Sequence, residues 1–150
     1  MKLRCISLHQ PYASAVALGL KKIETRNRPT FVTGLIGIHA AKLSNQSLRD
    51  RFYQFCGVPL VGNAFKVAGM QDFDNLPFGK IVAVAELVES VNTEMVRRNL
   101  SVPEFLFGDY DNGRHAWILK EIRPIARPIP AKGKRGFFFV VVKPHQLEAA

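Results

Sequence analysis

Apolar positions along the chain follow two different repeats, and each repeat predicts a different kind of element. Alternating or uninterrupted apolar runs predict five or six strands, at residues 3–8, 22–27, 35–40, 80–91, 115–122 and 137–142. Apolar residues at helical spacing predict helices at residues 11–18 and 44–55 and a shorter one at 93–99. The run at 80–91 is the longest apolar stretch, so we expect it at the centre of the sheet.

These elements show no regular alternation of strand and helix along the chain. Their order favours an α+β fold, built on a mostly antiparallel, barrel-like sheet with two or three short helices. Residues 57–77 hold three glycines and two prolines, and we interpret them as an irregular surface insertion. The chain of 150 residues has the length of one domain, so we expect residues 1–150 to form a single domain.

The chain is strongly basic, with 21 Lys and Arg against 12 Asp and Glu and a formal net charge of +9. Such a charge favours polyanionic partners, of which nucleic acid is the first candidate. Two cysteines and a start without a signal-like apolar core favour an intracellular, cytoplasmic location. No apolar run approaches the ~18 residues of a membrane span, so we expect no membrane partner.

The densest mixture of opposite charges follows the first predicted helix, where Gly19 precedes Lys21, Glu24 and Arg26. A lone carboxylate among cations is typical of a site that grips an anion, and a cation beside a carboxylate also suits general acid–base chemistry. An ion pair that only braces the sheet is the alternative interpretation of Glu24 and Arg26. Alternation along the second strand places Lys22 beside Glu24, so Lys21 joins the site only from the preceding turn.

Four further residues complete the predicted binding site. Gln10 and Tyr12 lie where the first helix begins, and Lys132 and Lys134 lie in a glycine-containing loop suited to an anion. Tyr12 is a candidate platform for base stacking, with a core aromatic as the alternative. The four histidines are far apart and pair with no Cys or carboxylate at ligand spacing, so we expect no metal site and no cofactor.

Six short motifs occur in a fixed order along the chain. They are S-L-H-Q-P-Y at 7–12, G-L-K-K-I-E-T-R at 19–26, I-H-A-A-K at 38–42, G-D-Y at 108–110, A-W-I-L at 116–119 and P-I-P-A-K-G at 128–133. This set resembles the ASCH domain (activating signal cointegrator homology), a family similar in fold to the PUA RNA-binding superfamily. The resemblance implies a PUA-like β-barrel whose cleft is lined by Gly19, Lys21, Glu24 and Arg26. On this motif we choose Lys21 over Lys22.

The resemblance also implies a function. The cleft of the family is thought to receive RNA, DNA or a modified nucleoside, and we expect a binding module for RNA or single-stranded nucleic acid. The alternative is a hydrolase, because some members resemble N4-acylcytidine amidohydrolases and others resemble metal-assisted ribonucleases. The amidohydrolases use a lysine, a threonine three residues later and a distant glutamate. Lys21 matches the lysine, Glu24 stands at the threonine position, and residues 97–101 offer no glutamate.

Overall fold

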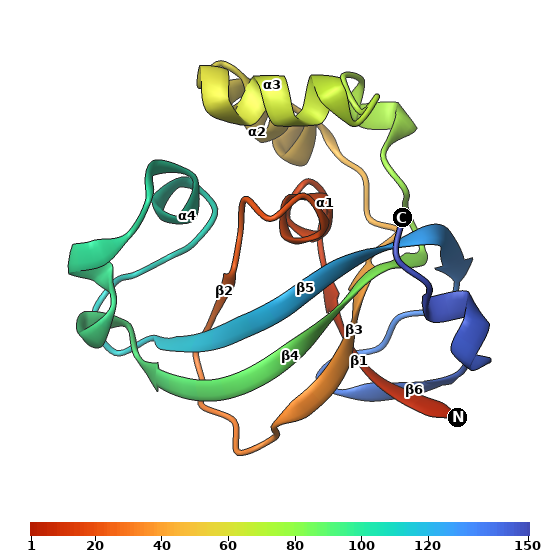
Figure 1. The fold of residues 1–150 in the computed structure, drawn as a ribbon. Coiled ribbons are helices and arrows are strands. Elements are labelled where there is room, and N and C mark those ends of the chain that lie inside the picture. Colours follow the sequence, from red (N-terminus) through yellow and green to blue (C-terminus); the bar gives the residue numbers. More distant parts are fainter.

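Six strands form one curled sheet in the computed structural model, which describes residues 1–150 (Figure 1). The spatial order is β2-β5-β4-β3-β1-β6. The strands are β1 Lys2–Leu8, β2 Ile23–Arg26, β3 Gly34–Ala40, β4 Lys80–Asn92, β5 His115–Pro130 and β6 Phe138–Val141. Only β1 and β3 pair in parallel, and the other four neighbouring pairs are antiparallel. The expected α+β fold with a mostly antiparallel, barrel-like sheet is confirmed, and the sheet is a half-barrel.

Four α-helices accompany the sheet, where two or three helices were expected. They are α1 Tyr12–Ala17, α2 Gln46–Cys56, α3 Pro59–Val67 and α4 Val102–Leu106, with short 3-10 turns at 73–75, 93–95, 97–99 and 144–147. The α2 helix begins as its sequence predicts, because the Asn45 side chain accepts a hydrogen bond from the Leu48 N–H at 2.9 Å. No helix in the structure is both long enough and apolar enough to span a membrane.

The interpretation of residues 57–77 as an irregular insertion is wrong, because this segment contains α3 and a 3-10 turn. Pro59 occupies the first turn of α3, where a proline costs no helical hydrogen bond. Phe65 and Phe73 are buried against Phe52 of α2. The glycines and prolines predict turns, but the burial of these rings decides the local structure.

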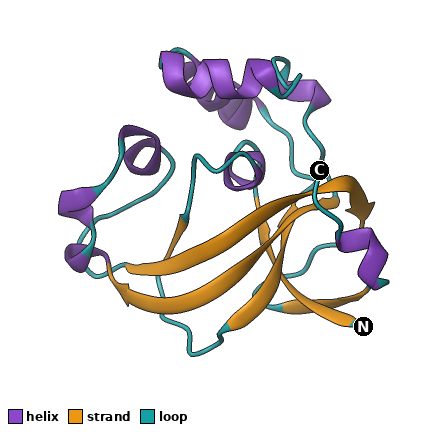
Figure 2. Ribbon diagram, in the orientation of Figure 1, coloured by secondary structure: helices purple, strands orange, loops and turns teal.

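The short helix α1 fills the concave side of the sheet (Figure 2). Its Ala13 and Val16 belong to a buried cluster with residues of β1, β3, β4 and β5. Ala15, on another face of the same helix, packs into a second cluster with α2, α3 and Phe107. Small alanine side chains let the helix lie close to both layers. The helix therefore joins the sheet to the α2–α3 layer.

The half-barrel is open beside the end of β1, because β6 pairs only with residues 2–5 of that strand. One side chain crosses from the opposite edge of the sheet to this gap: Arg26 Nη2, from β2, donates to the Ser7 carbonyl of β1 at 3.3 Å. Trp117 Nε1 of β5 donates to the Arg28 carbonyl at 3.1 Å and so fixes the chain that follows β2. The closure brings the charged segment at β2 next to the end of β1.

Replacing Phe65 by alanine tests the role of the α3 layer. The ring is 1% exposed, and its loss removes buried apolar contact and leaves a cavity, so Phe65→Ala should lower the free energy of unfolding by about 3–5 kcal/mol. Urea denaturation measures this change. Val67→Ala is the matched control, because Val67 lies in the same helix and is 90% exposed, and it should change stability by less than about 0.5 kcal/mol.

Candidate functional site

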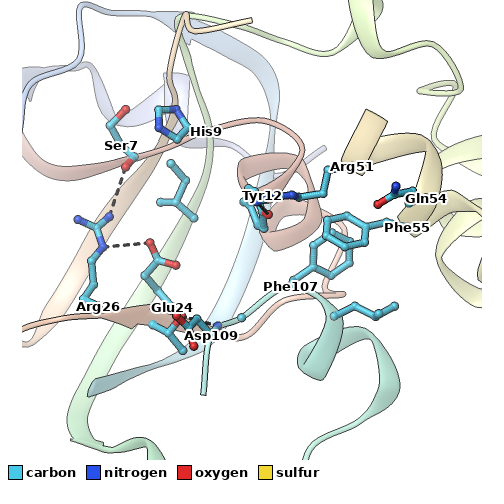
Figure 3. A pocket seen from close by; sticks show the side chains of 14 residues that line it. Ser7, His9, Tyr12, Glu24, Arg26, Arg51, Gln54, Phe55, Phe107 and Asp109 are labelled. Carbon is cyan, nitrogen blue, oxygen red and sulfur yellow. Dashed lines mark hydrogen bonds and ion pairs between the residues drawn. The ribbon is translucent and has the colours of Figure 1, made fainter. Parts of the chain in front are cut away.

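A pocket of about 630 Å³ opens between the end of β1, α1, β2, α2 and the segment after α4 (Figure 3). One side is polar and carries Ser7, His9 and Arg26, with Glu24 beside Arg26. The opposite side is aromatic and carries rings of Tyr12, Phe55 and Phe107. The pocket therefore offers an apolar wall facing a set of hydrogen-bonding and charged groups, as small-molecule sites do.

The aromatic wall is a set of three rings packed edge to face. Ring centroids of Tyr12 and Phe55 lie 6.0 Å apart, those of Tyr12 and Phe107 lie 6.1 Å apart, and those of Phe55 and Phe107 lie 4.7 Å apart. Arg51 Nη1 donates to the Tyr12 hydroxyl at 3.0 Å. Phe107 is buried, whereas Tyr12 and Phe55 remain partly exposed to the pocket. Tyr12 is thus both an accessible ring and a partner of the apolar cluster.

Glu24 forms ion pairs with two cations at once. Its Oε1 lies 3.2 Å from Lys21 Nζ, and its Oε2 lies 3.0 Å from Arg26 Nε. Glu24 and Arg26 both line the pocket, whereas Lys21 is only 1% exposed and lies behind Glu24. The carboxylate is held in one position by a cation on each oxygen.

The structure brings Lys21, and not Lys22, to Glu24. The reason lies in the turn after α1, where Gly19 adopts a left-handed backbone with φ of 76°. The Lys21 N–H still donates to the Ala15 carbonyl at 3.2 Å, so this residue belongs to the turn and not to the strand. The alternation that places Lys22 beside Glu24 applies only from Ile23 onward, and Lys22 is exposed.

Glu104, which sequence reasoning missed, lies directly beside this segment. Its carboxylate accepts hydrogen bonds from the Lys22 N–H at 3.0 and 2.9 Å and from the Ile23 N–H at 2.9 Å. Burial raises the pKa of the Glu104 carboxyl, against the opposing effect of these hydrogen bonds and of Lys21. Ser101 three residues earlier gives the spacing of a capping box, which signals a helix start. In this fold the Glu104 side chain does not close a capping box but accepts hydrogen bonds from the backbone at the beginning of β2.

Tyr110 adds a second buried polar group next to Glu104. Its hydroxyl is buried without a hydrogen-bond partner, and burial together with the charges of Glu104 and Glu24 raises the pKa of the phenol. The ring packs closely against Gly108, which lines the pocket. Behind Glu24 there is therefore a buried group of one carboxyl, one ammonium and one phenol, those of Glu104, Lys21 and Tyr110.

Thr25 also borders the pocket, although its strand position turns it away from Glu24. Its hydroxyl accepts a hydrogen bond from the Asp109 N–H at 3.0 Å. Gln10 does not line the pocket: its side-chain amide is fully buried, donates to Ser14 Oγ at 2.8 Å and to the Pro77 carbonyl at 2.9 Å, and accepts from the Ser14 N–H at 3.0 Å. Gln10 thus fixes the start of α1.

Lys132 and Lys134 are exposed in the loop before β6 and do not line the pocket. Between them Gly133 packs against His39 and Ser7 so closely that an added Cβ would lie 2.7 Å from the His39 Cε1 atom and 3.2 Å from the Ser7 Oγ atom. Ser7 is a pocket residue. The basic loop therefore lies on the surface next to the polar side of the pocket.

His39 holds this loop in place. Its Nε2 donates to the Ala131 carbonyl at 2.7 Å, since a carbonyl only accepts, and Nδ1 then accepts from the Ser7 hydroxyl at 2.9 Å. The imidazole is 1% exposed, and burial lowers its pKa from the usual 6.5. The neutral tautomer satisfies both contacts.

The structure contains no group of three His, Cys, Asp or Glu side chains arranged to hold a metal ion. Cys5 and Cys56 are both free. Burial raises the pKa of the Cys5 thiol to about 11 and also raises the pKa of Cys56. Both therefore remain thiols, which are weak nucleophiles, at neutral pH.

Comparison with known proteins identifies one family and three similar solved structures. The profile of the ASCH domain matches residues 6–129. Three crystal structures of an ASCH protein from Zymomonas mobilis resemble the chain at low identity. A tyrosine-to-phenylalanine variant is 20% identical over 87% of this chain and 76% of its own (TM-score 0.48). The unsubstituted protein is 21% identical over 85% of this chain and 72% of its own, with a TM-score of 0.48. A serine-to-alanine variant is 18% identical over 95% of this chain and 89% of its own, with a TM-score of 0.50. No curated protein matches the chain.

The lowered pKa of His39 predicts a pH dependence of stability. The unfolded chain takes up a proton near pH 6.5, whereas the folded chain does so only at lower pH, so stability falls as the pH is lowered through this interval. His39→Gln should flatten that fall. Urea midpoints at about pH 7.5 and about pH 5.5 measure it.

His145→Gln is the control for this experiment, because His145 is exposed near the C-terminus and should leave the pH dependence unchanged. An unchanged pH dependence in His39→Gln would contradict the assignment of this fall in stability to the buried His39 imidazole.

Proposed function

The chain belongs to the ASCH domain family, and from this premise we propose that it binds single-stranded RNA with one nucleotide held in the pocket. The observation that carries the proposal is the pairing of an aromatic wall with an anchored Glu24 and Arg26 in one pocket. A nucleotide has a flat base, a hydrogen-bonding edge and an anionic phosphate, and the pocket offers a complement to each.

The base has a partner in the partly exposed rings of Tyr12 and Phe55. Stacking of a base on an aromatic side chain contributes about 1–3 kcal/mol and needs no particular base. The volume of about 630 Å³ lies within the range of small-ligand pockets. The aromatic wall therefore supports binding of an unstacked nucleotide, which single strands offer and duplexes do not.

The polar side of the pocket is suited to hydrogen bonds with the edge of the base and with the phosphate. Glu24 is an acceptor and is suited to N–H or O–H groups of a base or a ribose. Arg26 and Arg51 contribute guanidinium groups from the two sides of the pocket. Arginine is well suited to phosphate because its planar fork donates two parallel hydrogen bonds.

The charge of the whole chain and the basic loop next to the pocket support binding of phosphates beyond the nucleotide in the pocket. A net charge of +9 favours a polyanion, and Lys132 and Lys134 are exposed beside the polar side of the pocket. These lysines are suited to the phosphates of neighbouring nucleotides. Contacts of this kind give affinity without sequence preference and make it depend on salt.

Substitution of Tyr12 tests the stacking contact. Tyr12→Ala should weaken the binding of a nucleoside monophosphate by roughly 5- to 150-fold, the equivalent of the stacking energy, as measured by calorimetric titration. Tyr12→Phe keeps the ring and loses only the hydroxyl, so it should bind nearly as the original chain does. Equal affinities of all three proteins would contradict the aromatic platform.

Salt dependence tests the phosphate contacts of the basic loop. For single strands the slope of log affinity against log salt is about −0.7 per neutralised phosphate, so Lys132→Ala or Lys134→Ala should each reduce it by about 0.7. Lys66→Ala is a matched control, because Lys66 is exposed on α3 away from the pocket lining. Binding that is absent or independent of salt would overturn the proposal.

A hydrolase is the second candidate, as an amidohydrolase of N4-acylcytidine or a metal-assisted ribonuclease. The observation in its favour is the buried ammonium of Lys21 at 3.2 Å from Glu24, with Glu104 close by. In this candidate Lys21 and Glu24 are the catalytic residues. Its test is incubation with acylated cytidines and with RNA, with and without divalent metal. Turnover that Glu24→Gln abolishes supports it, and turnover untouched by that change contradicts this site.

A further inference from the structure

A second surface, on β1 and β6, combines exposed apolar side chains with cations. On β6, Phe139 is 57% exposed and Val141 is 77% exposed. Across the β1–β6 pair, Arg4 lies opposite Phe139 and Lys2 lies opposite Val141. Figure 1 shows these two strands side by side near the N-terminus. Each exposed apolar residue thus has a basic neighbour directly across the pair.

This surface is connected to the pocket by a continuous series of stacked groups. The Arg26 guanidinium lies 5.3 Å from the Trp117 ring, and the Trp117 and Phe137 rings stack in parallel with centroids 5.5 Å apart. The Arg4 guanidinium then lies 5.8 Å from the Phe137 ring and 5.2 Å from the Phe139 ring. The series begins at a pocket residue and ends at the exposed ring of Phe139.

The charge of the segments that carry this surface has a single sign. Residues 1–8 and 131–143 contain no Asp or Glu and hold Lys2, Arg4, Lys132, Lys134, Arg135 and Lys143. A second copy of this chain would bring the same charges against one another and be repelled. A polyanion with flat bases complements both the cations and the exposed ring.

We propose that Phe139 and Arg4 form a second nucleotide contact, which binds a base of the same RNA strand beyond the nucleotide in the pocket. This inference rests on the proposed function. Arg4 holds the Phe139 ring on one side, and the other part of the ring is free for stacking with a base. Phosphates between the two contacts lie against the lysines and Arg135 of the loop before β6.

The test compares a nucleoside monophosphate with a fluorescently labelled single-stranded RNA of about eight nucleotides, a length within the range that single-strand binding folds cover. Phe139→Ala should weaken binding of the RNA by roughly 5- to 150-fold and leave the affinity for the monophosphate unchanged. Phe139→Trp keeps a stacking ring and should restore RNA binding. Because Phe139 is exposed, thermal unfolding should show both variants folded.

The outcomes separate this inference from the proposed function. If the unsubstituted chain binds neither ligand, the proposed function fails and this inference fails with it. If it binds RNA but Phe139→Ala binds RNA equally well, the second contact alone is overturned. A dimer in sedimentation that Phe139→Ala dissociates, with unchanged RNA affinity, also overturns it and assigns the surface to self-association.

Discussion

The site depends on one carboxylate shared by two cations. Glu24 lies within ion-pair distance of both Lys21 and Arg26, and Lys21 is almost completely buried. Removing one partner of a buried pair typically costs about 3–5 kcal/mol, because the remaining charge is left uncompensated. Arg26 also reaches the carbonyl of Ser7, so the same network closes the half-barrel. The geometry of the pocket and the stability of the fold therefore share the same interactions.

Two layers around α1 make this arrangement possible. The helix has only six residues and is too short to be stable alone, so packing must maintain it. Its alanines contact the sheet on one side and the aromatic layer of α2 and α3 on the other. Gln10 fixes its start, and Glu104 fixes the backbone that follows its end. Tyr12 and Lys21 are consequently held at opposite ends of one rigid unit.

The sequence predicts those parts of the molecule that local pattern determines. The strand at 80–91 and the helix capped by Asn45 follow from apolar periodicity and capping chemistry, and both are present. The features that the sequence did not predict depend on contacts between residues far apart in the chain. Burial of Phe65 stabilises a helix in a segment that contains glycines and prolines. Glu104 forms hydrogen bonds with β2, about 80 residues earlier in the chain. Lys21 was found through its motif, since strand alternation alone favours Lys22.

The contact of Gly133 with His39 has a further consequence for the cost of ligand binding. Ordering a flexible loop on binding reduces the binding free energy by about 0.5–1.5 kcal/mol for each side chain that is immobilised. The lost backbone entropy reduces it further. Here the backbone at residues 131–133 is already held by the hydrogen bond from His39 to Ala131 and by the close packing of Gly133. The exposed side chains of Lys132, Lys134 and Arg135 remain to be ordered. The conformational entropy of this part of the loop is thus lost during folding, so a polyanion bound as proposed above would meet a surface that is largely preorganised.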